Sequence, residues 1–93
     1  MSPFEALQLP NGQVLANRIA KAAMEENMAD ARQAPSRELK QLYQAWADGE
    51  PGVLLSGTVM IDRRAMTGPG GVVLEDEQQL DSFREWADVA RAR

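Results

Sequence analysis

A chain of 93 residues and 10.2 kDa has room for one small domain, which buries only a modest fraction of its surface. It contains no Cys and no His, which excludes disulfides, thiol catalysis, the commonest general base and the commonest metal ligand. The formal net charge is −4 and the basic residues are scattered, so the chain has no electrostatic footprint for nucleic acid or an anionic membrane.

The balance of apolar and charged residues is that of a globular chain rather than a disordered one. Hydrophobic residues make up 44% of the sequence and charged residues 26%. The N-terminal residues lack the basic start and apolar run of a signal peptide. The longest strongly apolar run, residues 53–55, is far too short to span a bilayer. We therefore expect a cytoplasmic protein that binds neither nucleic acid nor membrane.

The first predicted element is a β-hairpin over residues 7–15. Apolar and polar residues alternate on both sides of Pro10-Asn11-Gly12. Asn-Gly between two alternating runs is a strong hairpin signal, because a type I′ turn needs positive φ at both of its central positions. An isolated hairpin is marginal in water, so its apolar side should cover another part of the fold, such as the bottom of a barrel.

A strand over residues 18–24 and a helix over residues 36–48 come next, separated by a polar loop. Ser36 is the expected N-cap of the helix. The large apolar residues of this segment recur at helical spacing, which predicts an amphipathic helix. They are Leu39, Leu42, Tyr43 and Trp46. Gly49 ends the helix.

A second strand over residues 53–59 opens with an apolar run that suits a parallel strand covered on both faces. The loop after it contains residues 68–71, which lack the Lys-Ser/Thr ending of a phosphate loop and are predicted to be a turn. A helix over residues 76–93 is predicted to be capped by Asp76. No Gly, Asn or Pro ends it before Arg93, so we expect the chain to stop short of a complete fold.

Strands that alternate with helices predict an α/β architecture with a parallel sheet and right-handed crossovers. A short internal repeat supports this prediction. The sequence at residues 45–48 is nearly repeated at residues 85–88, an interval of 85 − 45 = 40 residues. That interval fits a β/α unit.

Small residues mark the ends of both predicted core strands. Ala22, Ala23 and Gly57 would let a ligand approach the backbone. Taken without any resemblance, small residues at strand ends more often indicate tight packing or a turn than a ligand site, and Met24 could simply be a core residue.

Two charged clusters can be interpreted either as functional sites or as solvated surface residues. Glu25 and Glu26, together with Asp30, lack the spacing of a calcium loop, which favours a solvated loop. Arg63 and Arg64 could meet a substrate carboxylate or phosphate, but a solvated basic pair is the default interpretation.

Several motifs together resemble the start of a known family. Residues 9–12, Leu15, residues 17–19 and residues 22–24 are similar to the N-terminal segment of the Old Yellow Enzyme family. This family comprises FMN-dependent NADH:flavin oxidoreductases and ene-reductases, including a dienoyl-CoA reductase-like branch. A later set of residues resembles the first helix and second strand of the family. These are Leu42-Tyr43, Trp46-Ala47, Gly49 and residues 52–57.

The resemblance implies a TIM (β/α)8 barrel, of which this chain would provide an N-terminal hairpin and two β/α units. Such barrels carry their active site at the C-terminal ends of the strands and need about 250 residues. The implied cofactor is FMN, with NAD(P)H as the reductant and an activated alkene or similar small molecule as the acceptor. By resemblance, the catalytic residues would all lie beyond Arg93, so none is expected within this chain.

The resemblance also implies which residues meet the ligands. The expected FMN contacts are Ala22, Ala23, Met24, Glu25 and Gly57, and Asn27 is the expected substrate-pocket residue.

Two of these positions depart from the family pattern. Ala23 stands where the family often has Pro, and Glu25 stands where it usually has Thr or Cys. A carboxylate beside a reduced, anionic flavin would be repelled in a partly desolvated site. Glu25 would therefore point away, be protonated or lower the flavin potential.

Open strand edges and uncovered apolar side chains predict that the chain needs the remaining barrel strands or self-associates. Expressed alone, it should be marginally folded or oligomeric and should not hold FMN tightly. The alternative function is that of a catalytically silent chain that self-associates or acts as a small interaction module.

Overall fold

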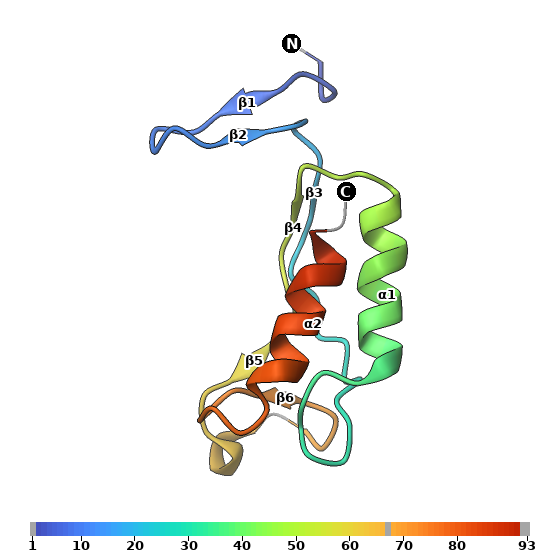
Figure 1. Cartoon of the computed structure of the whole chain (residues 1–93), viewed down its shortest axis with the longest axis vertical. Coiled ribbons are helices and arrows are strands. Elements are labelled where there is room, and N and C mark those ends of the chain that lie inside the picture. The colour runs from blue at the N-terminus through green and yellow to red at the C-terminus, as the bar shows by residue number, and fades with distance from the viewer. Residues whose placement is uncertain (1, 67, 92–93) are drawn as a thin grey trace.

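A computed structural model describes residues 2–66 and 68–91. It is an α/β structure of short paired strands and two helices, elongated to 44 × 25 × 22 Å (Figure 1). The strands form three separate two-stranded pairs, of which the first is antiparallel and the other two are parallel. Neither described helix is long enough and apolar enough to cross a membrane.

The predicted hairpin is present as β1 (Leu7–Gln8) and β2 (Val14–Leu15), with Leu7 opposite Leu15. Its turn differs from the prediction, because Gly12 has a φ of 91° and Asn11 is not among the positive-φ residues. The Gly12 N–H donates to the Leu9 carbonyl at 3.0 Å, as in a three-residue loop that closes on a left-handed glycine.

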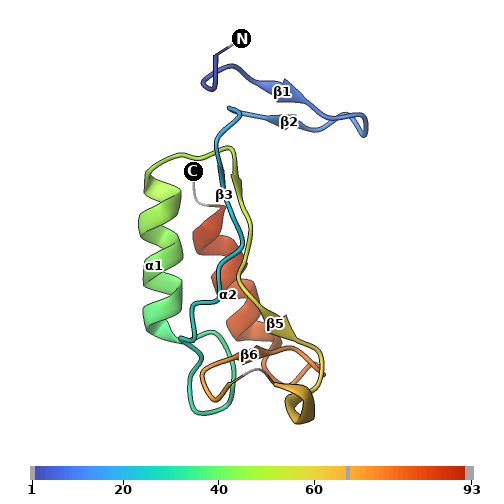
Figure 2. The same ribbon diagram turned by 180° about the vertical axis from the view of Figure 1, so that it is seen from behind.

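The hairpin stands at one end of the molecule, away from both helices (Figures 1 and 2). The expectation that its apolar side covers another part of the fold is wrong for Val14, which is 62% exposed. Two bonds tie the hairpin region to the next segment. The Arg18 N–H donates to the Pro3 carbonyl at 2.8 Å, and its guanidinium donates to the Ala6 carbonyl at 3.3 Å.

A parallel pair at the centre is formed by β3 (Ala20–Lys21) and β4 (Val53–Leu54). At the start of β3, Asn17 holds the two strands together. Its Oδ1 accepts from the Gly52 N–H at 2.7 Å, and its Nδ2 donates to the Glu50 carbonyl at 2.8 Å. Regular pairing covers less than the predicted range 18–24, because only one strand adjoins β3 and the last ladder bond runs from the Leu55 N–H to the Lys21 carbonyl.

The predicted second strand, residues 53–59, is divided in two. Residues 55–58 form no ladder, and β5 (Val59–Met60) pairs in parallel with β6 (Val72–Val73). A further strand, β6, was not predicted from the sequence and follows a 3₁₀ turn at Arg63–Ala65 and the glycine-rich turn of residues 68–71. Its Val73 N–H donates to the Gln33 carbonyl at 2.8 Å, so β6 is held by the loop that precedes the first helix.

Both helices match their predicted positions, although one begins later. The first, α1 (Arg37–Asp48), has Ser36 at its N-cap as predicted. The second, α2 (Leu80–Ala90), starts four residues after Asp76, and the predicted Asp76 cap is wrong. Asp76 instead accepts from the Gln78 N–H at 2.9 Å in the turn before the helix. Residues 92–93 of the predicted helix lie outside the described residues.

The core lies between α1, α2 and β6 and is built on Leu39, Tyr43, Val72 and Trp86. The Tyr43 ring meets both Trp46 and Trp86 edge-on, with ring centroids 5.1 Å apart in each case. Such edge-to-face pairs add to the free energy of burying apolar area. Both helices lie on the same side of the β3–β4 pair (Figures 1 and 2), so the opposite face of this pair is uncovered by any described element.

Ser36→Ala should destabilise the chain by roughly 1–2 kcal/mol, since it removes a helix N-cap. The Ser36 hydroxyl accepts from the Leu39 N–H at 3.0 Å and donates to the Met28 carbonyl, which ties α1 to the preceding loop. Chemical denaturation would measure the loss. The control is Ser56→Ala at an exposed serine, and equal stability of the two variants would contradict the assignment.

Candidate functional site

The expected flavin-contact residues gather where the two central strands end. Residues 22–25 follow β3 directly and are exposed, whereas Gly57 follows β4 by three residues and is buried. A Cβ built on Gly57 would overlap the Met24 carbonyl oxygen and the Glu26 carboxylate. The two strand ends therefore approach so closely at Gly57 that a side chain has no room there.

Asn27 lies beside the same edge in a strained backbone conformation. It is exposed and has a φ of 56°, in the left-handed region that asparagine tolerates better than most residues. A Cβ built on Gly70 would lie 2.6 Å from the Asn27 carbonyl oxygen. The expected pocket residue is thus held against the glycine-rich turn, which has the turn conformation that the sequence predicts.

The backbone at this edge has free hydrogen-bonding capacity. The last ladder bond is donated by the Leu55 N–H to the Lys21 carbonyl at 3.1 Å. Among the described residues, no acceptor pairs with the backbone N–H groups of Ala22, Ala23 and Met24. Because backbone donors are normally paired, consecutive open N–H groups at an exposed strand end can bind an acceptor-rich ligand.

A polar cluster lies directly behind this edge and consists of Lys21, Glu26 and Tyr43. The Tyr43 hydroxyl donates to Glu26 Oε2 at 2.6 Å. It accepts from Lys21 Nζ at 3.2 Å and from the Gly57 N–H at 3.2 Å. A longer contact of 3.5 Å joins the hydroxyl to the Leu55 carbonyl. Since a phenol offers one proton and two lone pairs, the three shorter bonds already use its whole capacity.

The cluster buries two opposite charges. The side chains of Lys21 and Glu26 are only 10% and 8% exposed, and Lys21 Nζ lies 3.7 Å from Glu26 Oε2. Lys21 Nζ also lies 5.0 Å from the centroid of the Tyr43 ring and 4.8 Å from that of Trp46. Two aromatic faces and a carboxylate thus compensate the cost of taking this ammonium out of water.

The environment raises the pKa of Tyr43 well above its ordinary value of about 10. Burial is the main cause, followed by the hydrogen bond to Glu26 and the charge of Glu26, and the Gly57 N–H partly offsets them. A raised pKa in the folded state stabilises the fold at pH values below about 10, and this stabilisation is lost as the pH rises through the folded-state value.

This cluster was not predicted from the sequence. The interpretation of Glu26 as part of a solvated loop is wrong, because its carboxylate is buried and paired. Tyr43 is a core residue as expected, but its hydroxyl also carries the polar contacts. A signal was available in Lys21, a charged residue with two apolar residues on each side in the predicted strand, which requires a counter-ion when the strand is covered.

The basic pair at Arg63 and Arg64 is engaged by carboxylates on its own loop. Arg63 pairs with Glu75, and the Arg64 guanidinium lies 2.7 Å from Asp62 Oδ2. These arginine contacts lower the pKa values of Asp62 and Glu75. Because the arginines already have partners at the surface, they form no open anion site.

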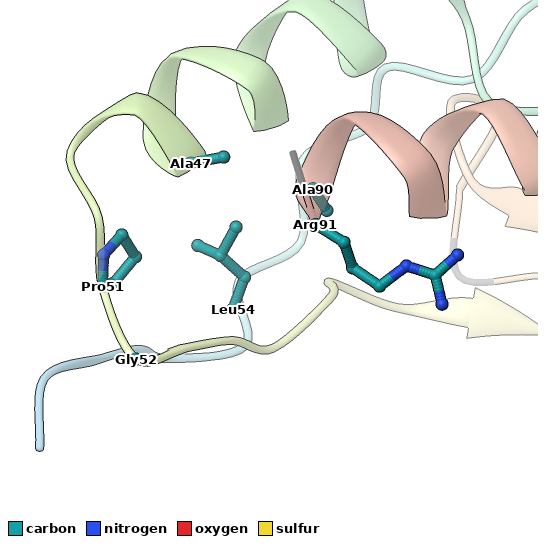
Figure 3. Close-up of a pocket in the computed structure, with 6 residues that line it drawn as sticks. All are labelled: Ala47, Pro51, Gly52, Leu54, Ala90 and Arg91. Atoms are coloured by element: carbon teal, nitrogen blue, oxygen red, sulfur yellow. The ribbon is translucent and has the colours of Figure 1, made fainter. Parts of the chain in front are cut away.

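A separate hollow of about 240 Å³ lies at the other end of the strands (Figure 3). It is lined by Ala47, Pro51, Gly52, Leu54, Ala90 and Arg91. These residues come from the C-terminal ends of α1 and α2 and from the start of β4. The hollow is therefore remote from Gly57 and from the strand ends where α/β folds bind their ligands.

Comparison with known sequences identifies relatives of one enzyme class. No family model matches the chain. An NADH-dependent flavin oxidoreductase of Hypocrea jecorina is 31% identical over 84 residues, which cover 86% of this chain and 21% of that protein. Another from Aspergillus parasiticus is 34% identical over 88 residues, which cover 82% of this chain and 20% of that protein. The chain spans about a fifth of the length of these relatives.

Solved structures share the fold of the chain. The old yellow enzyme homologue of Zymomonas mobilis matches with a TM-score of 0.85 and 16% identity, covering 99% of this chain and 25% of that one. Morphinone reductase matches with a TM-score of 0.79 and 21% identity, covering 97% of this chain and 23% of that one. The expected resemblance to the Old Yellow Enzyme family is therefore confirmed.

Gly57→Ala should destabilise the chain by roughly 1–3 kcal/mol, because an added methyl overpacks the strand ends against backbone and a buried carboxylate. Gly68→Ala is the matched control, since a Cβ at Gly68 meets nothing within 4 Å. Thermal or chemical denaturation of both variants would measure the difference. A neutral Gly57→Ala would refute the close approach of the two strand ends.

Alkaline titration should show an elevated pKa for Tyr43, the only tyrosine of the chain, through its phenolate absorbance. Glu26→Gln should lower the midpoint, because it removes the charge that opposes a phenolate while burial still acts. Glu25→Gln, at the exposed neighbouring position, should leave the midpoint unchanged. A midpoint at the ordinary value in the folded wild-type chain would contradict the buried Tyr43–Glu26 bond.

Proposed function

We propose that this chain, a relative of the NADH-dependent flavin oxidoreductases, supplies one edge of the FMN site of such an enzyme. The edge consists of the expected contact residues Ala22, Ala23, Met24, Glu25 and Gly57, with Asn27 facing the substrate. The remaining strands of a (β/α)8 barrel would complete the site. The chain alone would be inactive.

The open backbone at the end of β3 is the observation that carries this proposal. The N–H groups of Ala22, Ala23 and Met24 have no acceptor among the described residues, and the two alanines add little bulk around them. A flavin ring carries carbonyl oxygens and ring nitrogens along one edge, so it offers acceptors for such a row of donors. The residues present thus fit the cofactor.

The uncovered face of the β3–β4 pair supports the need for further strands. Met24 is 51% exposed and Leu55 is 50% exposed, although both are large apolar residues near the strand ends. In a closed barrel this face would point inward, where side chains pack in layers. The neighbour from Zymomonas mobilis matches the chain with only 25% of its own length, which leaves ample chain for those strands.

When bound, FMN would supply hydride transfer from NADH or NADPH to an activated alkene or a similar acceptor. The part played by this chain is to bind one edge of the ring through backbone groups and to hold it at the strand ends. Gly57 contributes by leaving room for the strands to converge. General acids or bases and the phosphate site would come from the rest of the barrel.

Glu25 sets this site apart from the family pattern. It is exposed in the row of expected contact residues, where relatives of the family usually have Thr or Cys. An ionised Glu25 beside the ring would disfavour the reduced, anionic flavin and so lower its reduction potential. If its side chain turns away or is protonated, the potential would be unaffected.

A second candidate function is that of a silent, self-associating chain. The exposed apolar face and the open edges of three short strand pairs favour it, because such surfaces promote association between copies. This function requires no cofactor and no further strands.

Reconstitution would separate the two functions. The chain would be mixed with a fragment of the Hypocrea jecorina relative that lacks the matched segment, and retained FMN would be measured after gel filtration. We expect FMN to be retained by the mixture and not by the chain alone. Ala22→Phe should abolish retention by blocking the backbone edge, whereas Ala45→Phe, on the exposed surface of α1, should not. A mixture without FMN, together with oligomers of the chain alone, would favour the silent function.

A further inference from the structure

The buried cluster of Lys21, Glu26 and Tyr43 has no part in the proposed contacts with the flavin. We propose that this cluster is a positioning device, in which the Tyr43 hydroxyl fixes the segment 22–25 and Gly57 relative to each other. The part of this inference that concerns the flavin rests on the proposed function. The fixing of the backbone belongs to the chain itself and is testable without ligand.

The two charged residues of the cluster flank the exposed segment 22–25. Lys21 immediately precedes the segment 22–25, and Glu26 immediately follows it. Their side chains turn to the helix side and lie 3.7 Å apart at Nζ and Oε2, while the four residues between them are exposed. The residues at the two ends of the segment 22–25 are therefore paired with each other on the helix side.

Tyr43 lies where it can bond both strand ends. It projects from the middle of α1, between the segment 22–25 and the end of β4. Its oxygen is bonded to Lys21, Glu26 and the Gly57 N–H. One oxygen atom thus connects both ends of the segment 22–25 to Gly57, which follows β4. Removing that atom would leave a buried amide and two buried charged groups short of a partner.

Burying the two charges of the cluster costs free energy. A buried ion pair commonly contributes no more stability than apolar side chains of the same volume, because both charges lose their hydration. Packing alone would therefore not require Lys21 and Glu26 behind an exposed strand end. Fixed geometry is what such a cluster provides, and binding sites gain affinity when their backbone is ordered before the ligand arrives.

The test measures backbone order in the ligand-free full chain by ¹⁵N relaxation. In the wild type, the amides of residues 22–25 should have the order parameters of rigid backbone, about 0.85. Tyr43→Phe keeps the ring packing but removes the hydroxyl, so these values should fall to below about 0.6 and the Gly57 amide should lose exchange protection. Trp86→Phe is the control, because it weakens the same core and the packing of the Tyr43 ring without removing any polar atom of the cluster.

Variants of the two charged residues, Lys21 and Glu26, test the positioning role even if Tyr43→Phe does not fold. Lys21→Met leaves the Glu26 carboxylate buried without its cation, so it should disorder the segment 22–25. Lys21→Met combined with Glu26→Gln removes both charges and keeps an acceptor for Tyr43, so it should restore order. Unchanged order in Tyr43→Phe or Lys21→Met, or equal disorder in Trp86→Phe, would overturn the proposal.

Flavin binding in the reconstituted mixture gives the second measurement. Tyr43→Phe should weaken FMN binding about tenfold, which corresponds to one lost hydrogen bond. If the wild-type mixture binds no FMN, the proposed function fails, and the relaxation measurements still decide the positioning role. If the variant binds FMN as tightly as the wild type, the cluster does not position the flavin edge.

Discussion

The Tyr43 hydroxyl joins parts of the chain that otherwise meet only through apolar packing or short ladders. It is buried in the core with Leu39 and Trp86, yet its oxygen reaches the end of β3 and the backbone after β4. The ring thus contributes to packing while the oxygen sets the separation of the two strand ends. Gly57 depends on the same geometry, since its lack of a side chain permits the approach that the hydroxyl then holds.

The two ends of the central strands β3 and β4 differ in their contacts. At the start of β3 and β4, Asn17 bonds both strands, and at their ends Tyr43 does so. The hollow lies near the Asn17 end, while the exposed backbone lies at the Tyr43 end. Because both helices cover one side only, the other side of the pair is available to further strands (Figure 2). This sidedness is what the proposed barrel requires.

Local chemistry was predictable from the sequence, whereas contacts between distant residues were not. Asn-Gly and the Ser36 cap predicted the hairpin and α1, because the signals act within a few residues. The second strand is divided because its two halves pair with different strands, and β6 is bonded to Gln33, so neither feature was visible locally. The same holds for the Lys21–Glu26 pair, which forms only when α1 supplies an aromatic cover.

The bonds of Tyr43 also bear on the order in which the chain folds during synthesis. They join residues only 14 to 22 positions apart in the sequence, and the Asn17–Gly52 bond spans 35. Loop closure over such short separations costs little entropy and is rapid. The β3–α1–β4 unit can therefore close these bonds soon after Gly57 leaves the ribosome, before later elements exist. In the proposed enzyme, the flavin edge would then be organised before the rest of the site forms.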